Sequence, residues 1–236
     1  VRTGALAPAP QNPFGLAIAG IAGRNPGADA DLRALQEVGQ KVRVFANETI
    51  FNEGDEAEFC YKVVSGAVRL CKHMSDGRRQ IADFLLAGDF FGFLQFEAYG
   101  FTAEAVGEVV LMRYPQGQVE RLRKSMPSMD SRMMTVLSQR LRDMQNHLVM
   151  LGRQTAKERV ASILLQLGER SEAEEDVAFD VPMCRQDIAD YLGLTVETVC
   201  RSLSELKRAR LIGIPVPNQI VLKDIETLYA IADGEE

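Results

Sequence analysis

A chain of 236 residues, of which 46% are hydrophobic and 25% charged, has the composition of an ordinary globular protein with one large or two modest domains. No apolar run reaches the roughly 18 residues that a membrane span needs, so we expect a cytoplasmic protein without a membrane partner. The net charge of −6 argues only weakly against nucleic-acid binding, because segment 120–159 holds nine Lys or Arg against four Asp or Glu and exposed charges act locally.

The N-terminal segment 1–31 is rich in Ala, Gly and Pro and has few large side chains. Such a segment buries too little apolar surface to order itself, so we expect a flexible arm. Leu32, Leu35 and Val38 then recur at helical spacing, which predicts a short lead-in helix.

Segment 41–115 has the pattern of an all-β domain. Glycines separate short runs of β-forming residues, and the Ser-Asp-Gly sequence at 75–77 is typical of a hairpin turn. The pattern predicts an antiparallel, jelly-roll-like β-roll, and we assign residues 32–125 to it.

A long helix is predicted over 126–152. Its large apolar residues alternate between spacings of three and four, which produces the narrow stripe of a coiled-coil seam rather than the wider apolar face of a globular helix. An amphipathic helix packed on its own domain is the alternative. We favour pairing of two copies along this stripe, which makes the protein a homodimer. The stripe consists of Met134, Leu137, Leu141, Met144, Leu148 and Leu151.

Residues 153–236 are predicted to form a separate domain, and Gly152 is a candidate hinge before it. After an acidic loop, two short helices at about 185–192 and 196–208 flank a Gly-Leu-Thr turn, the arrangement of a helix-turn-helix motif. Thr195 is the natural N-cap of the second helix. Residues 211–222 then read as a β-hairpin wing, followed by a short closing helix. The fold class is therefore α+β, with a β-roll, a long dimerisation helix and a C-terminal winged helix-turn-helix.

The second helix of this motif has one apolar and one polar face. A recognition helix presents its N-terminal half to base edges, where Arg201 suits guanine and Glu197 suits cytosine. The alternative is an i,i+4 Glu–Arg pair on a solvated helix, worth about 0.2–0.5 kcal/mol. We favour base contact because a wing follows the motif. The candidate DNA-binding residues are Arg185, Thr195, Glu197, Thr198, Cys200, Arg201, Ser204 and Arg208.

The sequence RQDIADYLGLTVETVCR at 185–201 resembles the helix-turn-helix signature of FNR and FixK regulators. Further matches are TAKERVA at 155–161, VVSGAV at 63–68 and SDGRRQI at 75–81, and the likeness covers roughly residues 42–225. The chain thus resembles the CRP/FNR superfamily of transcription regulators, and FixK-like members most. That resemblance implies a homodimer that binds double-stranded DNA at a TTGAT…ATCAA-type palindrome and acts on RNA polymerase, with activation as the expected outcome.

Three departures from the family predict that no known effector is bound. Cyclic-nucleotide-binding relatives carry Gly-Glu and Arg-Ser in the roll, whereas this chain has Gly92-Phe93 and Phe101-Thr102, which offer no charged partner to a phosphate. The cysteine cluster of FNR is absent, because residues 1–40 contain no cysteine. Cys71 and His73 are similar to the haem ligands of some relatives, but strand alternation also accounts for one buried and one exposed residue there.

We therefore expect no cofactor, and the four cysteines, none at CxxC spacing, predict no metal site. A ligand- or haem-gated regulator that uses the β-roll pocket is the alternative function. An enzyme is not expected, because the sequence has no serine elbow, phosphate loop or Cys–His–Asp constellation.

Cys184 and Cys200 stand where many relatives have serine. Cys184 is expected at the N-cap of the first helix of the motif, and Cys200 in the groove-facing row beside Arg201. Each thiol either replaces a hydroxyl of similar size or is a redox site, and the sequence leaves both interpretations open.

Overall fold

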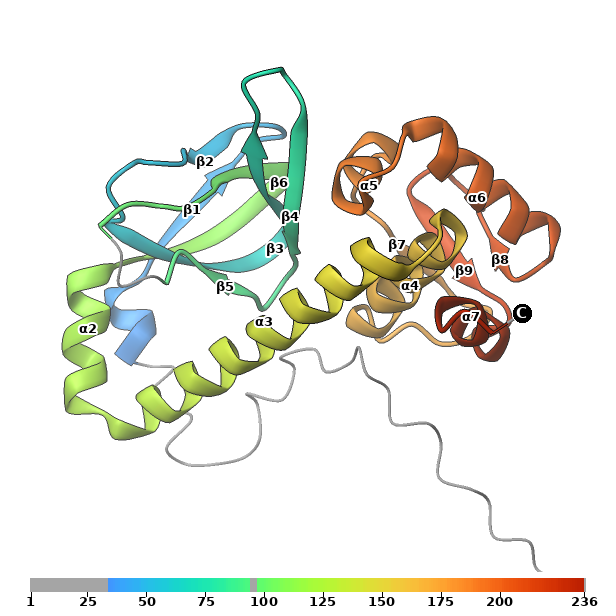
Figure 1. Ribbon diagram of the computed structural model, residues 1–236. Coiled ribbons are helices and arrows are strands. Elements are labelled where there is room, and N and C mark those ends of the chain that lie inside the picture. Colours follow the sequence, from blue (N-terminus) through green and yellow to red (C-terminus); the bar gives the residue numbers. More distant parts are fainter. Residues whose placement is uncertain (1–33, 94–96, 236) are drawn as a thin grey trace, which may run out of the picture.

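The computed structural model describes residues 34–93 and 97–235, and Figure 1 shows two lobes joined by one long helix. The predicted arm lies outside the described residues, and the lead-in helix is described, and helical, from 34 to 38. Within the described part of the chain, no helix combines the length and the apolar character that crossing a bilayer requires.

The N-terminal lobe is an antiparallel β-roll, as predicted. Two long strands, β3 (Phe59–His73) and β6 (Thr102–Pro115), form its centre in a sheet of order β1-β6-β3-β4. The predicted turn at 75–77 joins β3 to β4, and its glycine adopts the left-handed conformation with φ of +86°. The remaining strands of this sheet are β1 (Gln40–Val44), β2 (Thr49–Phe51), β4 (Arg79–Leu85) and β5 (Phe90–Phe91).

Aromatic side chains fill the interior of the roll. Phe51 stacks on Tyr99 with ring centroids 3.6 Å apart, and Tyr61 stacks on Phe91 at 5.1 Å. All four rings are buried in one cluster, and the Tyr99 hydroxyl donates to the carbonyl of Phe59 at 2.6 Å. Close-packed rings of this kind give the roll a solid core.

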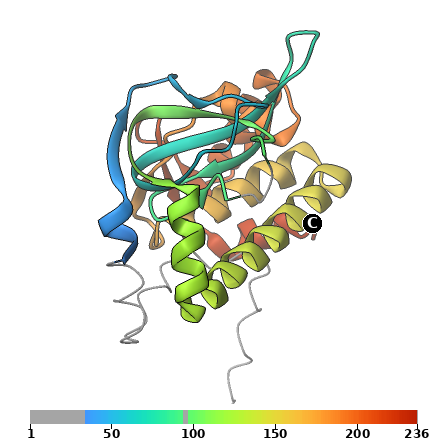
Figure 2. The same ribbon diagram turned by 90° about the vertical axis from the view of Figure 1, so that its left-hand side faces the viewer.

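The roll is followed by α2 (Gln116–Ser125) and the long helix α3 (Pro127–Arg153), which passes beneath the roll to the second lobe (Figures 1 and 2). Gly152, the predicted hinge, lies inside α3. The chain breaks instead at residues 154 and 155, because Thr155 begins α4 (Ala156–Arg170) with a complete capping box to Glu158.

The C-terminal lobe contains the predicted helix-turn-helix and wing. The motif consists of α5 (Arg185–Leu192) and α6 (Val196–Arg208). The wing strands are β8 (Ile212–Gly213) and β9 (Gln219–Leu222), and α7 (Ile225–Ala232) closes the lobe.

One strand of the C-terminal lobe was missed by the sequence analysis. β7 (Ala178–Asp180) lies at the end of the segment expected to be an acidic loop and pairs with β9. Its central residue, Phe179, is buried opposite Ile220, so the acidic flanks concealed a short strand with one inward side chain.

Candidate DNA-binding interface

The helix α6 has the two faces that its sequence predicts. Val199, Leu203 and Leu206 are buried against the rest of the lobe, and Val196 is half-buried. Ser202 is also buried, a polar exception that the apolar spacing does not predict. Burial of this stripe fixes which face of α6 points outward.

The outward face of α6 carries most of the candidate DNA-binding residues. Glu197 and Arg201 lie one turn apart, and no ion pair joins them among the described residues, so the i,i+4 pair considered as the alternative is not formed here. Thr198 is half-buried. The exposed candidates are Thr195, Glu197, Cys200, Arg201, Ser204 and Arg208.

Local hydrogen bonds set where α6 begins. Gly193 ends α5 in the left-handed conformation with φ of +63°, and the hydroxyl of Thr195 accepts from the backbone N–H of Thr198 at 3.2 Å. A hydrogen bond from the backbone N–H of Glu197, together with one from the Thr195 side chain, lowers the pKa of the Glu197 carboxyl. Glu197 is therefore a charged acceptor at neutral pH.

The candidate Arg185 also contacts the wing, which the sequence analysis missed. Its Nη2 donates to the carbonyl of Pro217 in the wing at 3.1 Å, and the side chain is half-buried. Arg185 thus ties the start of α5 to the wing.

The face of α5 turned toward the roll is closed by ion pairs. The carboxylate of Asp187 accepts from Arg69 Nη1 at 3.2 Å and from Arg79 Nη2 at 2.6 Å, and Asp190 lies 2.7 Å from Arg79. Arg69 and Asp187 are almost fully buried and 118 residues apart in the chain. Sequence reasoning missed this interface because no local pattern pairs residues at such separation.

A second set of ion pairs connects the roll to the helices beneath it. Arg140 of α3 lies 2.9 Å from both Asp83 and Asp89, and Arg170 of α4 binds Asp89 and donates to the Phe84 carbonyl at 3.0 Å. The roll therefore contacts α3, α4 and α5 through charged groups.

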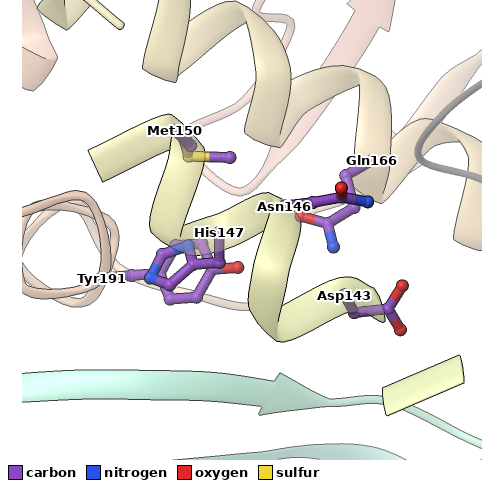
Figure 3. A pocket seen from close by; sticks show the side chains of 6 residues that line it. All are labelled: Asp143, Asn146, His147, Met150, Gln166 and Tyr191. Atoms are coloured by element: carbon purple, nitrogen blue, oxygen red, sulfur yellow. The ribbon is translucent and has the colours of Figure 1, made fainter. Parts of the chain in front are cut away.

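A small pocket of ≈ 10 Å³ lies where α3, α4 and α5 meet (Figure 3). His147 of α3 stacks on Tyr191 of α5 with ring centroids 4.1 Å apart. Neither ring nitrogen of His147 has a hydrogen-bond partner among the described residues. Burial, and secondarily the Arg159 charge, lowers the pKa of His147 to about 4, so its ring is neutral at pH 7.

The predicted stripe on α3 is exposed in the single chain. Leu148 is 68% exposed and Met134 63%, values that are unusual for such large apolar side chains. Leu137, Leu141 and Met144 are exposed as well, whereas Leu151 is half-buried where α3 approaches Gly193. The face of α3 that carries Met134, Leu141 and Leu148 thus has no cover within the described chain.

The four cysteines fall into two classes. Cys60 and Cys71 are buried, and burial raises the pKa of Cys60 to about 12 and that of Cys71 to about 11. Cys184 and Cys200 are exposed. Cys184 is the N-cap of α5, as predicted: its sulfur accepts from the N–H of Asp187 at 3.4 Å and its thiol donates to the Asp187 carboxylate at 3.3 Å.

The expectation that strand alternation separates Cys71 from His73 is wrong. Residues two apart on a strand share a face, and the Cys71 sulfur is 3.5 Å from His73 Nε2 although one residue is buried and the other exposed. Glu104 on β6 completes the group, with Oε1 3.3 Å from the same His73 nitrogen. The sequence analysis missed this carboxylate, because Glu104 comes from a different strand.

Both lobes match known protein families. The model of a cyclic nucleotide-binding domain matches residues 41–126, and that of a Crp-like helix-turn-helix domain matches residues 158–231. FixK, a nitrogen fixation regulation protein of Azorhizobium caulinodans, is 41% identical over 94% of this chain and 90% of its own length. The transcriptional activatory protein AadR of Rhodopseudomonas palustris is 38% identical over 92% of this chain and 90% of its length.

A solved structure has the same architecture. FixK2 from Bradyrhizobium japonicum superimposes with a TM-score of 0.79 at 36% identity, over 82% of this chain and 97% of that one. The relatives are transcription regulators and not enzymes, as the sequence predicted.

Proposed function

Since the chain belongs to the CRP/FNR family, as a FixK-like DNA-binding transcription regulator, we propose that two copies bind one palindromic DNA site through their α6 helices. The observation that carries this proposal is the outward face of α6, where Glu197 and Arg201 are exposed and unpaired with each other. Among the described residues, the Arg201 side chain makes no ion pair or hydrogen bond, so it is available for guanine O6 and N7, and the charged Glu197 is available for cytosine N4.

The exposed stripe on α3 supports the dimer. Leu141 and Met144 are each 58% exposed, and apolar side chains in a two-in-seven repeat gain most when a second helix covers them. Two copies paired along α3 present two α6 helices, and consecutive major grooves on one face of DNA are about 34 Å apart. The palindrome implied by the family resemblance, TTGAT…ATCAA, has matching two-fold symmetry.

The packing of the roll supports DNA binding without a cyclic nucleotide. Phe93 packs on Phe90 with ring centroids 5.5 Å apart, and the Phe101 ring lies beneath the Lys72 ammonium at 5.4 Å. At the positions where nucleotide-binding relatives have an acid and an arginine, this chain thus has one ring that packs on another ring and one that contacts an ammonium group. Phe51 and Tyr99 stack in the buried core of the roll. The roll serves as a scaffold in this proposal.

Activation of transcription through RNA polymerase is the expected output. Support comes from the relatives, since AadR carries the name of an activatory protein. The exposed thiols Cys184 and Cys200 add a point of oxidative control in this proposal, because reagents reach them while Cys60 and Cys71 are buried. Oxidation at Cys184 adds negative charge 3.3 Å from the Asp187 carboxylate, and oxidation at Cys200 adds it beside Arg201.

The competing function, a haem- or ligand-gated regulator, has one observation in its favour, the closeness of Cys71 and His73. An absorbance spectrum of protein purified from cells supplied with haem separates the two functions. A Soret band that disappears in His73→Ala favours the gated regulator. Its absence, with full DNA binding, favours the scaffold.

The decisive experiment compares two DNA duplexes, one with the palindrome TTGAT…ATCAA and one in which a single half-site is scrambled. We expect two chains on each palindrome and an affinity for it that is about 10² to 10⁴ times higher than for the scrambled duplex, since the second half-site is bound intramolecularly. Gel shift and ultracentrifugation measure affinity and stoichiometry. One chain per duplex with equal affinity for both duplexes overturns the proposal.

A further inference from the structure

We propose that Cys71, His73 and Glu104 form a binding site for a divalent transition-metal ion of the Zn²⁺ class, at the contact between the roll and α5. One sulfur, one imidazole nitrogen and one carboxylate oxygen lie within 4.8 Å of one another. These are the three donor types that zinc takes in proteins. The inference concerns the roll and does not depend on DNA binding.

The distances within the group match a tetrahedral site. With Zn–S of about 2.3 Å, Zn–N of about 2.0–2.1 Å and Zn–O of about 2.0–2.2 Å, the S···N edge of a tetrahedron is about 3.5 Å and the N···O edge about 3.3–3.4 Å. The Cys71 sulfur is 3.5 Å from His73 Nε2, and that nitrogen is 3.3 Å from Glu104 Oε1. The third edge, between the sulfur and a carboxylate oxygen, is within 4.8 Å, and movement of the carboxylate toward the sulfur shortens it to the tetrahedral value of about 3.6 Å.

The sheet places the three side chains on one face. Cys71 and His73 are two residues apart on β3, and Glu104 lies on β6 opposite Arg69, the residue two before Cys71. Three donors from two adjacent strands converge on one point. That is the coordination of a single ion, because a haem iron already has four ring nitrogens and has no room for three side-chain ligands.

The surroundings orient the carboxylate. Arg69 Nε binds Glu104 Oε2 at 2.8 Å, and Arg79 lies 3.8 Å from the same oxygen. The two arginines thus hold one oxygen and leave Oε1 turned toward His73. Outer contacts of this kind fix first ligands in metal sites and strengthen binding by about 10- to 100-fold.

The charge balance favours a cation in spite of the two arginines. Arg69 and Arg79 contact three carboxylates, those of Glu104, Asp187 and Asp190, so the cluster has one excess negative charge. When an ion binds, Cys71 releases its proton to water and becomes a thiolate, which brings the excess to two. A divalent ion neutralises this charge.

The site has a buried and an open side. The Cys71 sulfur is enclosed and donates to the Thr102 carbonyl at 3.7 Å, whereas the His73 side chain is 54% exposed. An ion held between them therefore faces water on the His73 side. Three protein ligands and one water molecule complete a four-coordinate site.

Cobalt titration of the reduced, chelator-treated full-length protein tests the site, because Co²⁺ bound to a thiolate absorbs in the near ultraviolet. We expect one Co²⁺ per chain with this band, and its displacement by one equivalent of Zn²⁺. Cys71→Ser should abolish the band. His73→Ala and Glu104→Gln should weaken Co²⁺ binding at least about tenfold, the scale of losing a ligand or its support.

Matched controls separate this site from other donors. Cys184→Ser removes an exposed thiol and Glu53→Gln an exposed carboxylate that pairs with Lys72, and both should leave the titration unchanged. His73→Ala is the cleanest variant, because the His73 side chain is 54% exposed and its removal disturbs little packing. Absence of a thiolate band, a band that survives in Cys71→Ser, or equal affinity in His73→Ala overturns the proposal.

Discussion

The polar faces of α5 and α6 differ in what they contact, although only a short turn separates the helices. On α5, Asp187 is buried and binds Arg69 and Arg79 of the roll. On α6, Glu197 and Arg201 are exposed and make no ion pair with each other. Similar charged residues thus have opposite surroundings within one motif. One helix is held by the protein, and the other is left open to a ligand.

The largest effect is expected when dimerisation is prevented, because binding of a palindrome needs two α6 helices. Leu141→Lys places a charge in the centre of the exposed stripe on α3 and should prevent pairing of two chains. Affinity for the palindrome should then fall by about 10² to 10⁴, because the second half-site is no longer bound intramolecularly. Ultracentrifugation and gel shift measure both changes. Arg142→Leu, an exposed substitution off the stripe, is the control, and a normal dimer of Leu141→Lys would refute the assignment.

The next largest effect is expected on stability, through the ion pairs that hold α5 against the roll. Asp187→Asn removes the charge that Arg69 and Arg79 share, and breaking such a buried pair should cost about 3 kcal/mol of unfolding free energy. Asp190→Asn should cost less, because Asp190 is half-buried and pairs with Arg79 but not with Arg69. Urea denaturation followed by circular dichroism gives both values. Equal and negligible losses in the two variants would mean that α5 is not held by these ion pairs.

Substitution on the exposed face of α6 should change DNA recognition and leave stability unaffected. Arg201→Ala should leave stability unchanged and lower discrimination at the guanine of each half-site by roughly 1–3 kcal/mol. Lys207→Ala is the matched control, since Lys207 is also exposed on α6 but is not a candidate base contact. Loss of the Lys207 charge should lower the affinity for all DNA sequences alike. Unchanged preference of Arg201→Ala for the palindrome would place another element in the groove.

A smaller effect should appear on acidification, through the contact between α3 and α5. The folded-state pKa of His147 is lowered to about 4, so between pH 6.5 and 4 the unfolded chain binds the additional proton. Stability from this group is complete above pH 6.5 and is lost as the pH falls toward 4. Partial exposure reduces the effect to roughly 1–2 kcal/mol.

The variant His147→Phe keeps the stacking on Tyr191 and removes the titrating group. Its unfolding free energy should therefore fall less than that of the wild type between pH 7 and pH 5. Parallel pH profiles of the two proteins would show that His147 titrates normally.

The smallest effect is expected from oxidation. Peroxide should weaken DNA binding most at low salt, because added negative charge lowers the electrostatic part of affinity. The double variant Cys184→Ser, Cys200→Ser should keep its binding, while replacing buried Cys60 and Cys71 should give no protection. Equal inactivation of wild type and the double variant would mark the exposed thiols as substitutes for hydroxyls.

Local patterns were enough to predict α6, the wing hairpin and the exposed stripe on α3. The buried positions Val199, Leu203 and Leu206 follow from helical spacing alone, and the cap at Thr195 from its residue type. The same local reasoning put the break at Gly152, whereas α3 continues to Arg153 and the next helix begins after the capping box at Thr155.

The contacts of α5 could not be predicted in this way. Arg69 and Asp187 look like ordinary surface charges, and only the folded chain brings them together across 118 positions. Glu104 is similar: its register opposite Arg69 depends on the pairing of β3 with β6, which hydrophobic alternation does not specify. Long-range pairing of polar residues is therefore the part of this molecule that sequence patterns leave out.

The ion pairs at Asp187 also restrict how far the two lobes are interchangeable modules. Consider a chimera that joins this roll to the helix-turn-helix lobe of a relative without an acid at position 187. In it, Arg69 and Arg79 lose the carboxylate that both of them contact, in a buried interface. We expect a soluble hybrid only when Arg69 and Arg79 are exchanged together with the helix-turn-helix lobe that they contact. Positions 69, 79 and 187 thus form a unit of compatibility that crosses the boundary between the domains.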